Sequence, residues 1–447
     1  MSSPTNERAK EPRTSIPEDP SQASALREDG DDAATETVIS MPSHAPSPAA
    51  PELLPVPKRS WKSFPVLRVL VSVLASVGRG LKRLLAFLGY ANNLGVMYAY
   101  GRGVDKDEAE AVKWYRLAAD QGDADAQYNL GWMYANGRGV DKDDAEAVKW
   151  YRLAAVQGYA RAQYSLGLRY DNGRGVKRDE AEAVKWYRLA ANLGDADAQT
   201  NLGAMYANGQ GVNKDDGEAV KWYRLAADQG DATAQTILGA MYADGRGVKK
   251  DEAEAVKWFR RAADQGHADV QYNLGLRYAK GRGVNKDEAE AVKWYRLAAD
   301  QGLAIAQNDL GVMYENGRGV KKDDGETVKW YRLAADQELA PAQYNLGLMY
   351  AKGRGVDKDE AEAVKWYRLA ADQGGADAQN DLGVMYENGR GVNKDDAEAV
   401  KWFRLAADQG FANAQYNLGV MYANGRGSIR MKPKRRSGIG WRRNRAT

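Results

Sequence analysis

The sequence contains no cysteine and only two histidines among its 447 residues. Without cysteine the chain forms no disulfide bond and has no thiolate to bind a metal ion. His44 and His267 are far apart, and no group of His, Cys and Asp residues has the spacing of metal ligands. The composition therefore predicts a protein without a metal site or a cofactor.

Proline is also scarce, except near the N-terminus. Residues 1–60 and Pro65 hold eleven of the thirteen prolines, together with many serines, alanines and acids. No periodic apolar face runs through residues 1–60, so we predict a disordered extension there. The segment lacks a basic start followed by an apolar run, so we expect no cleavable secretory signal. The sequence leaves the compartment undetermined, either cytoplasmic or membrane-associated.

A 36-residue period dominates the rest of the chain. Nine tryptophans follow one another at intervals of 36 residues, from Trp114 to Trp402, and the glycine of an LG pair keeps the same step from Gly95 to Gly419. No insertion interrupts the series. A single unit of this size cannot bury its apolar face alone, so successive units are expected to stack.

Each unit contains the signals for two helices. In residues 123–158 the first stretch places Ala126, Leu130 and Tyr134 on one helical face, and Gly137 ends it. A D-x-x-E capping box at Asp143 opens the second helix. Its predicted core stripe consists of Ala147, Val148, Tyr151, Ala154 and Ala155. The Met133 position is Arg169 and Arg277 in other units, so we expect it to be half exposed.

The segments AQYNLGxMYANGRGV and DxAEAVKWYRLAADQG, which recur nine or ten times over residues 90–427, resemble the repeats of the Sel-one-like repeat (SLR) family. This resemblance implies a right-handed superhelix of two-helix repeats related to tetratricopeptide repeats. It also implies a role in binding proteins, as an adaptor that assembles complexes. The chain departs from the cysteine-rich secreted branch of that family. The predicted fold is an all-α solenoid of about nine repeats.

A basic segment precedes the array. No acid lies between Glu52 and Asp105, and residues 64–88 form an apolar stretch that arginines and lysines interrupt. We consider three interpretations of residues 61–89. They form a helix that caps the first repeat, an amphipathic helix that lies on an anionic membrane, or a transmembrane span. The span is disfavoured because each charge at the bilayer centre costs about 2.5–3.5 kcal/mol.

The array offers no signal for catalysis. Its carboxylates, such as Asp143 and Glu146, recur in every unit, as capping residues should, whereas catalytic residues would occur once. The GRG triplets lack the third glycine and the preceding strand of a dinucleotide-binding loop. We therefore predict that the protein is not an enzyme and has no catalytic residues.

Residues that vary between repeats are the candidates for partner binding. A stripe through Tyr128 and Trp132 lies opposite the core stripe of the first helix and changes from unit to unit. In related solenoids the first helices line the concave surface, and an exposed Tyr–Trp pair would be a natural anchor. The other interpretation is that these side chains pack between repeats. The residues predicted to contact a partner are Tyr128, Trp132, Tyr164, Leu168, Tyr272, Leu276, Tyr344 and Leu348.

These features favour a scaffold that binds a protein or peptide on the concave face of residues 90–427. An organiser held at a membrane surface by residues 61–89 is the alternative, and an enzyme of unknown type is the third. The array's charges repeat with the unit and are typical of a solvated face.

The tail, residues 428–447, has eight lysines and arginines and no acid. Although such a tail normally indicates binding to nucleic acid, we expect no nucleic-acid partner here. With suitable codons, the same nucleotides shifted by one base encode VNKDEAEAEKWYRLAAESGD, which matches residues 284–303 at 16 of 20 positions. We therefore hypothesise a frame-shifted repeat, which the third bases of the coding DNA will test.

Overall fold

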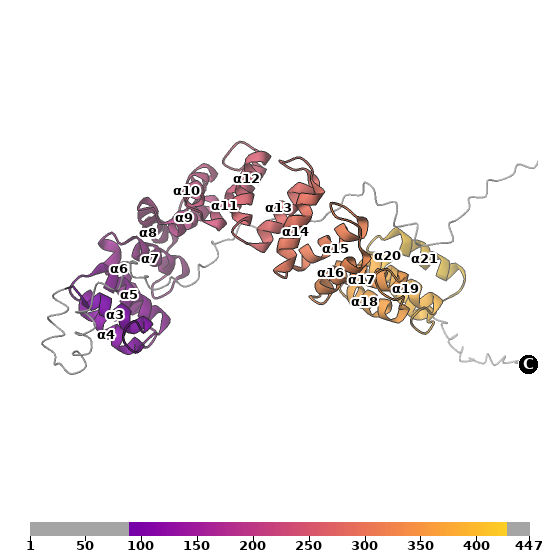
Figure 1. Ribbon diagram of the computed structural model, residues 1–447, viewed down its shortest axis with the longest axis horizontal. Helices are drawn as coiled ribbons and strands as arrows, with labels where there is room; N and C mark the ends of the chain where they lie inside the picture. The colour runs from indigo at the N-terminus through magenta and orange to yellow at the C-terminus, as the bar shows by residue number, and fades with distance from the viewer. Residues whose placement is uncertain (1–88, 427–447) are drawn as a thin grey trace, which may run out of the picture. The chain divides into compact units, whose positions relative to one another are not determined.

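The computed structural model describes residues 89–426, and in this range it contains only α-helices, turns and loops. Each repeat has a first and a second helix, except the last, of which only the first helix lies within the described residues (Figure 1). The first helices are α3 (Ala91–Tyr100), α5 (Ala124–Asn136), α7 (Ala160–Asn172), α9 (Ala196–Asn208), α11 (Ala232–Asp244), α13 (Ala268–Lys280), α15 (Ala304–Asn316), α17 (Ala340–Lys352), α19 (Ala376–Asn388) and α21 (Ala412–Ala423). The second helices are α4 (Glu108–Ala119), α6 (Asp144–Val156), α8 (Glu180–Asn192), α10 (Asp216–Asp228), α12 (Glu252–Ala263), α14 (Glu288–Asp300), α16 (Asp324–Ala335), α18 (Glu360–Asp372) and α20 (Asp396–Asp408).

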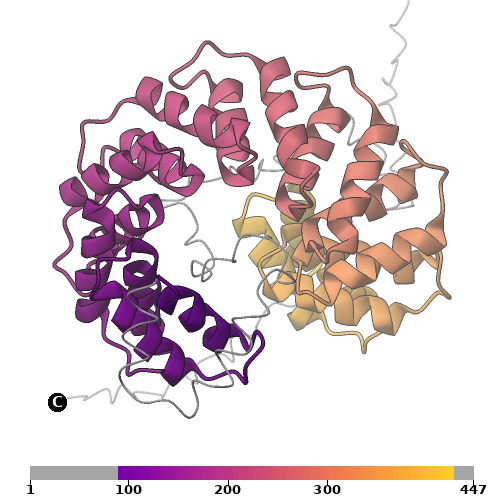
Figure 2. The ribbon, with the colours of Figure 1, turned by 60° about the vertical axis from the view of Figure 1, so that its left-hand side comes forward.

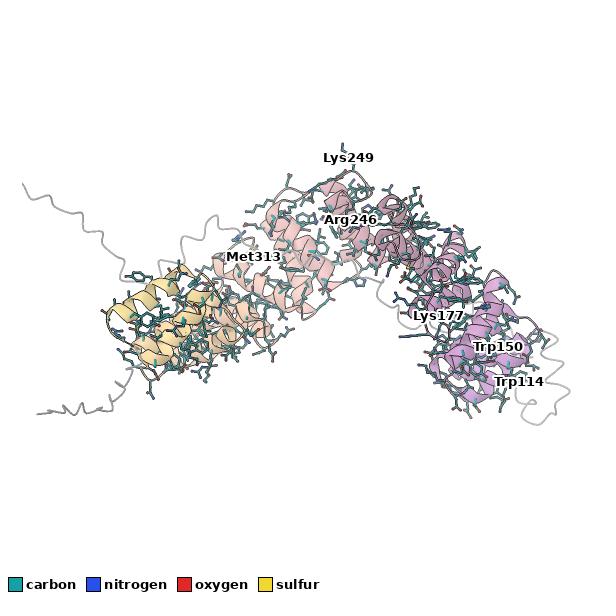
Figure 3. The ribbon with its side chains drawn as sticks, turned by 180° about the vertical axis from the view of Figure 1, so that it is seen from behind. Trp114, Trp150, Lys177, Arg246, Lys249 and Met313 are labelled. Carbon is teal, nitrogen blue, oxygen red and sulfur yellow. The ribbon has the colours of Figure 1, made fainter. Side chains whose placement is uncertain are left out.

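The helices pack in chain order. Each second helix contacts the first helix of its own repeat and the first helix of the next repeat, as α6 does with α5 and α7 (Figures 1 and 2). The tryptophans mark equivalent places in successive repeats, as Trp114 and Trp150 do in Figure 3. The predicted all-α solenoid of two-helix repeats is thus confirmed.

The second helices begin as the sequence predicts, with one difference. The Asp143 side chain accepts a hydrogen bond from the Glu146 amide at 2.9 Å, and the equivalent aspartate caps each of the other second helices. The Asp143 amide, however, donates to the Tyr134 carbonyl at 3.0 Å. Glu146 instead accepts hydrogen bonds from Lys149 and Trp150. The capping box is therefore only half used, because the loop backbone already satisfies the amide that glutamate would cap.

The core stripes are buried as predicted. The small and aromatic residues of the second helix, together with Ala126 and Leu130 of α5, are almost inaccessible to solvent. The expectation that Met133 is half exposed is wrong, since it is 1% exposed and belongs to the core. Arg169 fits at the equivalent place because its guanidinium lies over the Tyr151 ring and pairs with Asp144 at 2.5 Å.

The LG glycine provides room for an aromatic ring of the second helix. A Cβ atom on Gly131 would lie 2.8 Å from the Tyr151 ring, and one on Gly383 would lie 2.7 Å from the Phe403 ring. The same contact recurs in every repeat whose second helix is described. In α21 no second helix follows within the described residues, and a Cβ on Gly419 would meet no atom within 4 Å.

This difference predicts that one substitution has opposite effects at two equivalent positions. Gly383→Ala should lower the free energy of unfolding by about 2 kcal/mol, because the methyl group pushes Phe403 out of its place. Gly419→Ala should raise it by as much as about 1 kcal/mol, because alanine favours the helix and finds open space. Urea titration followed by circular dichroism measures both, and equal signs would contradict the packing described here.

The GRG loops join neighbouring repeats. In five of the triplets the arginine reaches an acid at the start of the preceding second helix, as Arg246 reaches Asp216 at 3.0 Å (Arg246 is labelled in Figure 3). Arg138 forms the same pair with Glu108 and holds the pKa of that carboxyl at about 2. The second glycine has a left-handed backbone, and a Cβ there would overlap the backbone of the preceding helix. We call these eight residues the seam glycines: Gly139, Gly175, Gly211, Gly247, Gly283, Gly319, Gly355 and Gly391.

Three predicted segments lie outside the described residues. They are the extension 1–60, the basic segment 61–89 except its last residue, and the tail 428–447. Their predicted roles as a disordered region, a capping or membrane helix and a frame-shifted repeat therefore stay predictions. Among the helices of residues 89–426, none combines the length and the apolar character needed to cross a membrane.

Candidate functional site

The stripe predicted to bind a partner is mostly buried. Tyr128 is completely inaccessible and Trp132 is only 8% exposed, so the expectation of an exposed Tyr–Trp pair is wrong. Tyr164, Tyr272 and Leu276 are buried as well. The remaining three candidates, Leu168, Tyr344 and Leu348, are half-buried.

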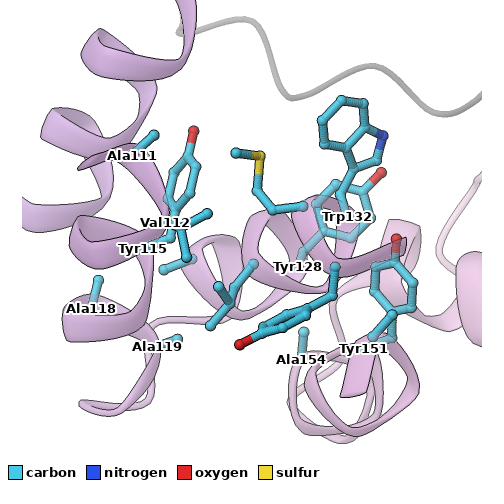
Figure 4. Packing of buried hydrophobic residues seen from close by; sticks show 14 of the residues in the cluster. Ala111, Val112, Tyr115, Ala118, Ala119, Tyr128, Trp132, Tyr151 and Ala154 are labelled. Atoms are coloured by element: carbon cyan, nitrogen blue, oxygen red, sulfur yellow. The ribbon is translucent and has the colours of Figure 1, made fainter. Parts of the chain in front are cut away.

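Contacts within and between repeats explain this burial. The centroid of the Tyr128 ring lies 5.7 Å from that of Tyr151 on α6 (Figure 4). It lies 5.4 Å from the ring centroid of Tyr159, which precedes α7. The Tyr272 hydroxyl donates to Asp309 of the next first helix at 2.9 Å. The predicted stripe therefore contacts neighbouring helices of both kinds: a second helix through Tyr151, and the next first helix through Asp309. The stripe opposite the core faces those neighbours rather than solvent.

The joint between first helices is polar. Besides the Tyr272–Asp309 bond, Tyr344 donates to Asp381 at 3.0 Å, and Asn308 accepts from Asn345 at 3.1 Å. Burial raises the pKa of the Asp381 carboxyl above its ordinary value. Such satisfied polar pairs fix the register of one repeat on the next. Their role is structural.

The ionisable side chains of the described residues do not gather into a metal site. No cluster of three or more His, Cys, Asp or Glu residues within residues 89–426 has the arrangement to hold a metal ion. Burial raises the pKa of the Asp195 carboxyl to about 6. Its oxygen accepts from the Ala198 amide at 2.9 Å as a helix cap, which accounts for its position.

Exposed leucines on the second helices were missed by the sequence analysis. In seven repeats, one leucine of the second helix stands outside the core stripe and is 42–48% exposed. These residues are Leu153, Leu189, Leu225, Leu297, Leu333, Leu369 and Leu405. The signal was present in the sequence, because an apolar residue recurs at a position between the charged Arg152 and the buried Ala154.

At two positions near the ends of α6 and α8, an apolar residue replaces the polar residue of the other repeats and so extends this apolar surface. Val156 stands where seven of the nine equivalent positions have aspartate, and Leu193 stands where the other eight have glutamine. Val156 is 66% exposed and Leu193 is 58% exposed, more than any of the recurrent leucines. We call Leu153, Val156, Leu189 and Leu193 the apolar patch. It belongs to the C-terminal ends of α6 and α8.

Comparison with known proteins identifies the repeat. The family model described as Sel1 repeat matches ten times over the chain, at residues 90–123, 124–159, 160–195, 196–231, 232–267, 268–303, 304–339, 340–375, 376–411 and 412–434. No curated protein matches this chain.

Two solved structures are similar over most of the array. The first is a protective antigen present in uropathogenic Escherichia coli strains, which displays an SLR fold; it is 41% identical, with 77% of this chain and 75% of that chain covered and a TM-score of 0.68. The second is a Sel1 repeat protein from Oxalobacter formigenes, which is 37% identical, with 69% of this chain and 89% of that chain covered and a TM-score of 0.55. The period, the two-helix unit and these matches agree, and the chain belongs to the Sel1 repeat family.

Proposed function

We propose that this protein is a non-enzymatic scaffold that binds protein or peptide partners along its solenoid. The observation that supports this function most directly is the ten-fold Sel1 repeat, since proteins of this family generally mediate protein–protein interactions. Stacked repeats with a recurrent exposed leucine provide an extended surface of the kind that solenoids use for binding.

The burial of the aromatic stripe changes where a partner is expected to bind. Tyr128, Trp132, Tyr164, Tyr272 and Leu276 support the packing and have little surface to offer. On the first helices, we propose Leu168, Tyr344 and Leu348 as the contacts. The second helices add the exposed leucines, which are apolar groups beside charged ones, as in the centre and rim of many interfaces.

Affinity purification of the intact chain, with mass spectrometry of the proteins that copurify, tests this function. We expect at least one partner that also binds the purified chain directly in isothermal titration calorimetry. The matched control is the intact chain with Leu297, Leu333 and Leu369 changed to glutamine, which removes three exposed leucines and leaves the core stripe unchanged. If no copurified protein binds directly, the scaffold function is wrong.

A further inference from the structure

We propose that the apolar patch on α6 and α8 is a docking site for an acidic partner segment that carries aliphatic side chains. This inference rests on the proposed scaffold function and specifies one surface and one class of ligand for it. It starts from the places at which two repeats depart from the other seven.

The array contains a polar version of the same site two repeats further on. Arg261 and Asp228 form an ion pair at 3.8 Å between α12 and α10, across the junction of two repeats. Leu189 and Val156 occupy the equivalent positions on α8 and α6, each 72 residues earlier. The equivalence therefore places these two apolar side chains on the same side of the junction between α6 and α8.

Leu193 extends the patch toward the same junction. At its equivalent positions Gln265 and Gln373 donate to the carbonyls of Gly230 and Glu338, which lie in the turn after the preceding second helix. By the same geometry Leu193 lies beside the turn that follows Val156. Leu153 and Val156 are three residues apart on α6, and Leu189 and Leu193 are four residues apart at the end of α8, so each pair shares a face.

Leu193 also has a structural cost. In seven other repeats the glutamine at this position donates to a buried glutamine of a first helix, as Gln157 does to Gln127 and Gln229 to Gln199, both at 2.7 Å. Gln163 should receive the bond from position 193, and its Oε1 is buried without a hydrogen-bond partner. A buried acceptor without a hydrogen bond lowers the stability of the fold, and an exposed leucine side chain adds no stability in return. Packing within the chain therefore does not explain why leucine stands at position 193.

The charged residues beside the patch indicate the sign of the charge that a partner should carry. The segments 149–158 and 185–194 each carry one lysine and one arginine and no acid, whereas the equivalent segment of every other repeat contains an aspartate. Lys149 and Lys185 pair with Glu146 and Glu182. Arg152 and Arg188 donate to the hydroxyls of Tyr170 and Tyr206, which carry no compensating charge. Carboxylates on a partner would complement these two guanidinium groups.

The experiment uses the intact chain and a fluorescein-labelled helical peptide with leucine at every third or fourth position and glutamate between. One control peptide has lysine in place of glutamate, and another has serine in place of leucine. In fluorescence anisotropy titrations we expect the acidic leucine peptide to bind more tightly than either control by about tenfold or more, since each favourable 1.4 kcal/mol is tenfold in affinity.

The decisive variant is Val156→Asp with Leu189→Arg and Leu193→Gln, which installs the residues found at positions 228, 261 and 265. It should weaken binding of the acidic peptide by about tenfold or more. The variant should fold at least as well as the natural chain, because a glutamine at position 193 can donate to Gln163, and circular dichroism checks this. The matched control Tyr416→Gln changes an apolar residue that is as exposed as Val156, at 66%, but belongs neither to the patch nor to the exposed leucines, and it should leave peptide binding unchanged. The reverse set, Asp228→Val with Arg261→Leu and Gln265→Leu, should create a second site.

Other outcomes would overturn the proposal. If the lysine peptide binds as tightly as the acidic one, the charge argument is wrong. If the natural chain self-associates in analytical ultracentrifugation and the triple variant does not, a second copy covers the patch instead. If the triple variant still binds the partners captured by the natural chain and the peptide equally well, the scaffold function stands and this surface is not the site. If the chain binds neither the peptide nor any cellular partner, both proposals fail.

Discussion

Gly319→Ala is expected to lower the free energy of unfolding by more than about 4 kcal/mol, the range in which single substitutions are exceptional. Gly319 is a seam glycine with φ of +66°, a conformation that costs an L-residue about 1–2 kcal/mol. A Cβ atom there would also overlap the carbonyl of Glu288 and lie 2.7 Å from the Ala289 amide nitrogen. Both neighbours are backbone atoms of the preceding repeat, so no rotamer change can make room.

Gly302→Ala is the matched control, because it separates backbone strain from the collision. Gly302 has φ of +92°, but a Cβ there would meet no atom within 4 Å. The chain itself shows that this position accepts a side chain, since Glu338 occupies the equivalent place with φ of +63°. We expect a loss of only about 1–2 kcal/mol. Urea unfolding followed by circular dichroism measures both variants, and similar losses would show that the seam does not depend on close backbone contact.

Replacing residues 428–447 by VNKDEAEAEKWYRLAAESGD, the string encoded in the neighbouring frame, is expected to stabilise the end of the array by about 2–3 kcal/mol. Tyr416 of α21 is 66% exposed, and Gly419 faces open space where Gly383 receives Phe403. The tyrosine of the new string has the same spacing from Gly419 as Phe403 has from Gly383. A second helix with that tyrosine would bury the open face of α21.

Amide hydrogen exchange of α21 measures this effect locally, because the end of a repeat array opens more easily than its middle. Protection of the α21 amides should rise by about thirtyfold or more, the equivalent of about 2 kcal/mol. The control is the same string with its tyrosine replaced by alanine, which should recover only part of the protection. Unchanged exchange would mean that the string does not supply the missing helix.

The period and the caps made the fold predictable from the sequence. A tryptophan every 36 residues sets the length of the unit, and Asp143 and Gly137 mark where one helix begins and the other ends. The core stripe of α6 also follows from helical spacing, since Tyr151 and its apolar neighbours recur on one face. These signals are local, and each is repeated in nearly every unit.

The candidate site was less predictable, because helical spacing tells which residues share a face but not what covers it. Tyr128 lies opposite the core stripe of α5, which in an isolated amphipathic helix would be the solvent side. In the solenoid, that side meets the helices that follow along the chain, through contacts such as Tyr128 with Tyr159 and Tyr272 with Asp309. The exposed positions Val156 and Leu193 could have been found by aligning the repeats with one another and noting where an apolar residue replaces a polar one.

The seam has a consequence for how such a chain changes over generations. Eight successive junctions between repeats use the same backbone contact, from Gly139 on Glu108 to Gly391 on Glu360. A unit cut out or duplicated between equivalent positions would present matching surfaces to its new neighbours. The gene can therefore lengthen or shorten the array by recombination between its own copies, in whole steps of 36 codons, without redesigning any interface. A shift of a single base has no such protection, since it replaces every later contact at once.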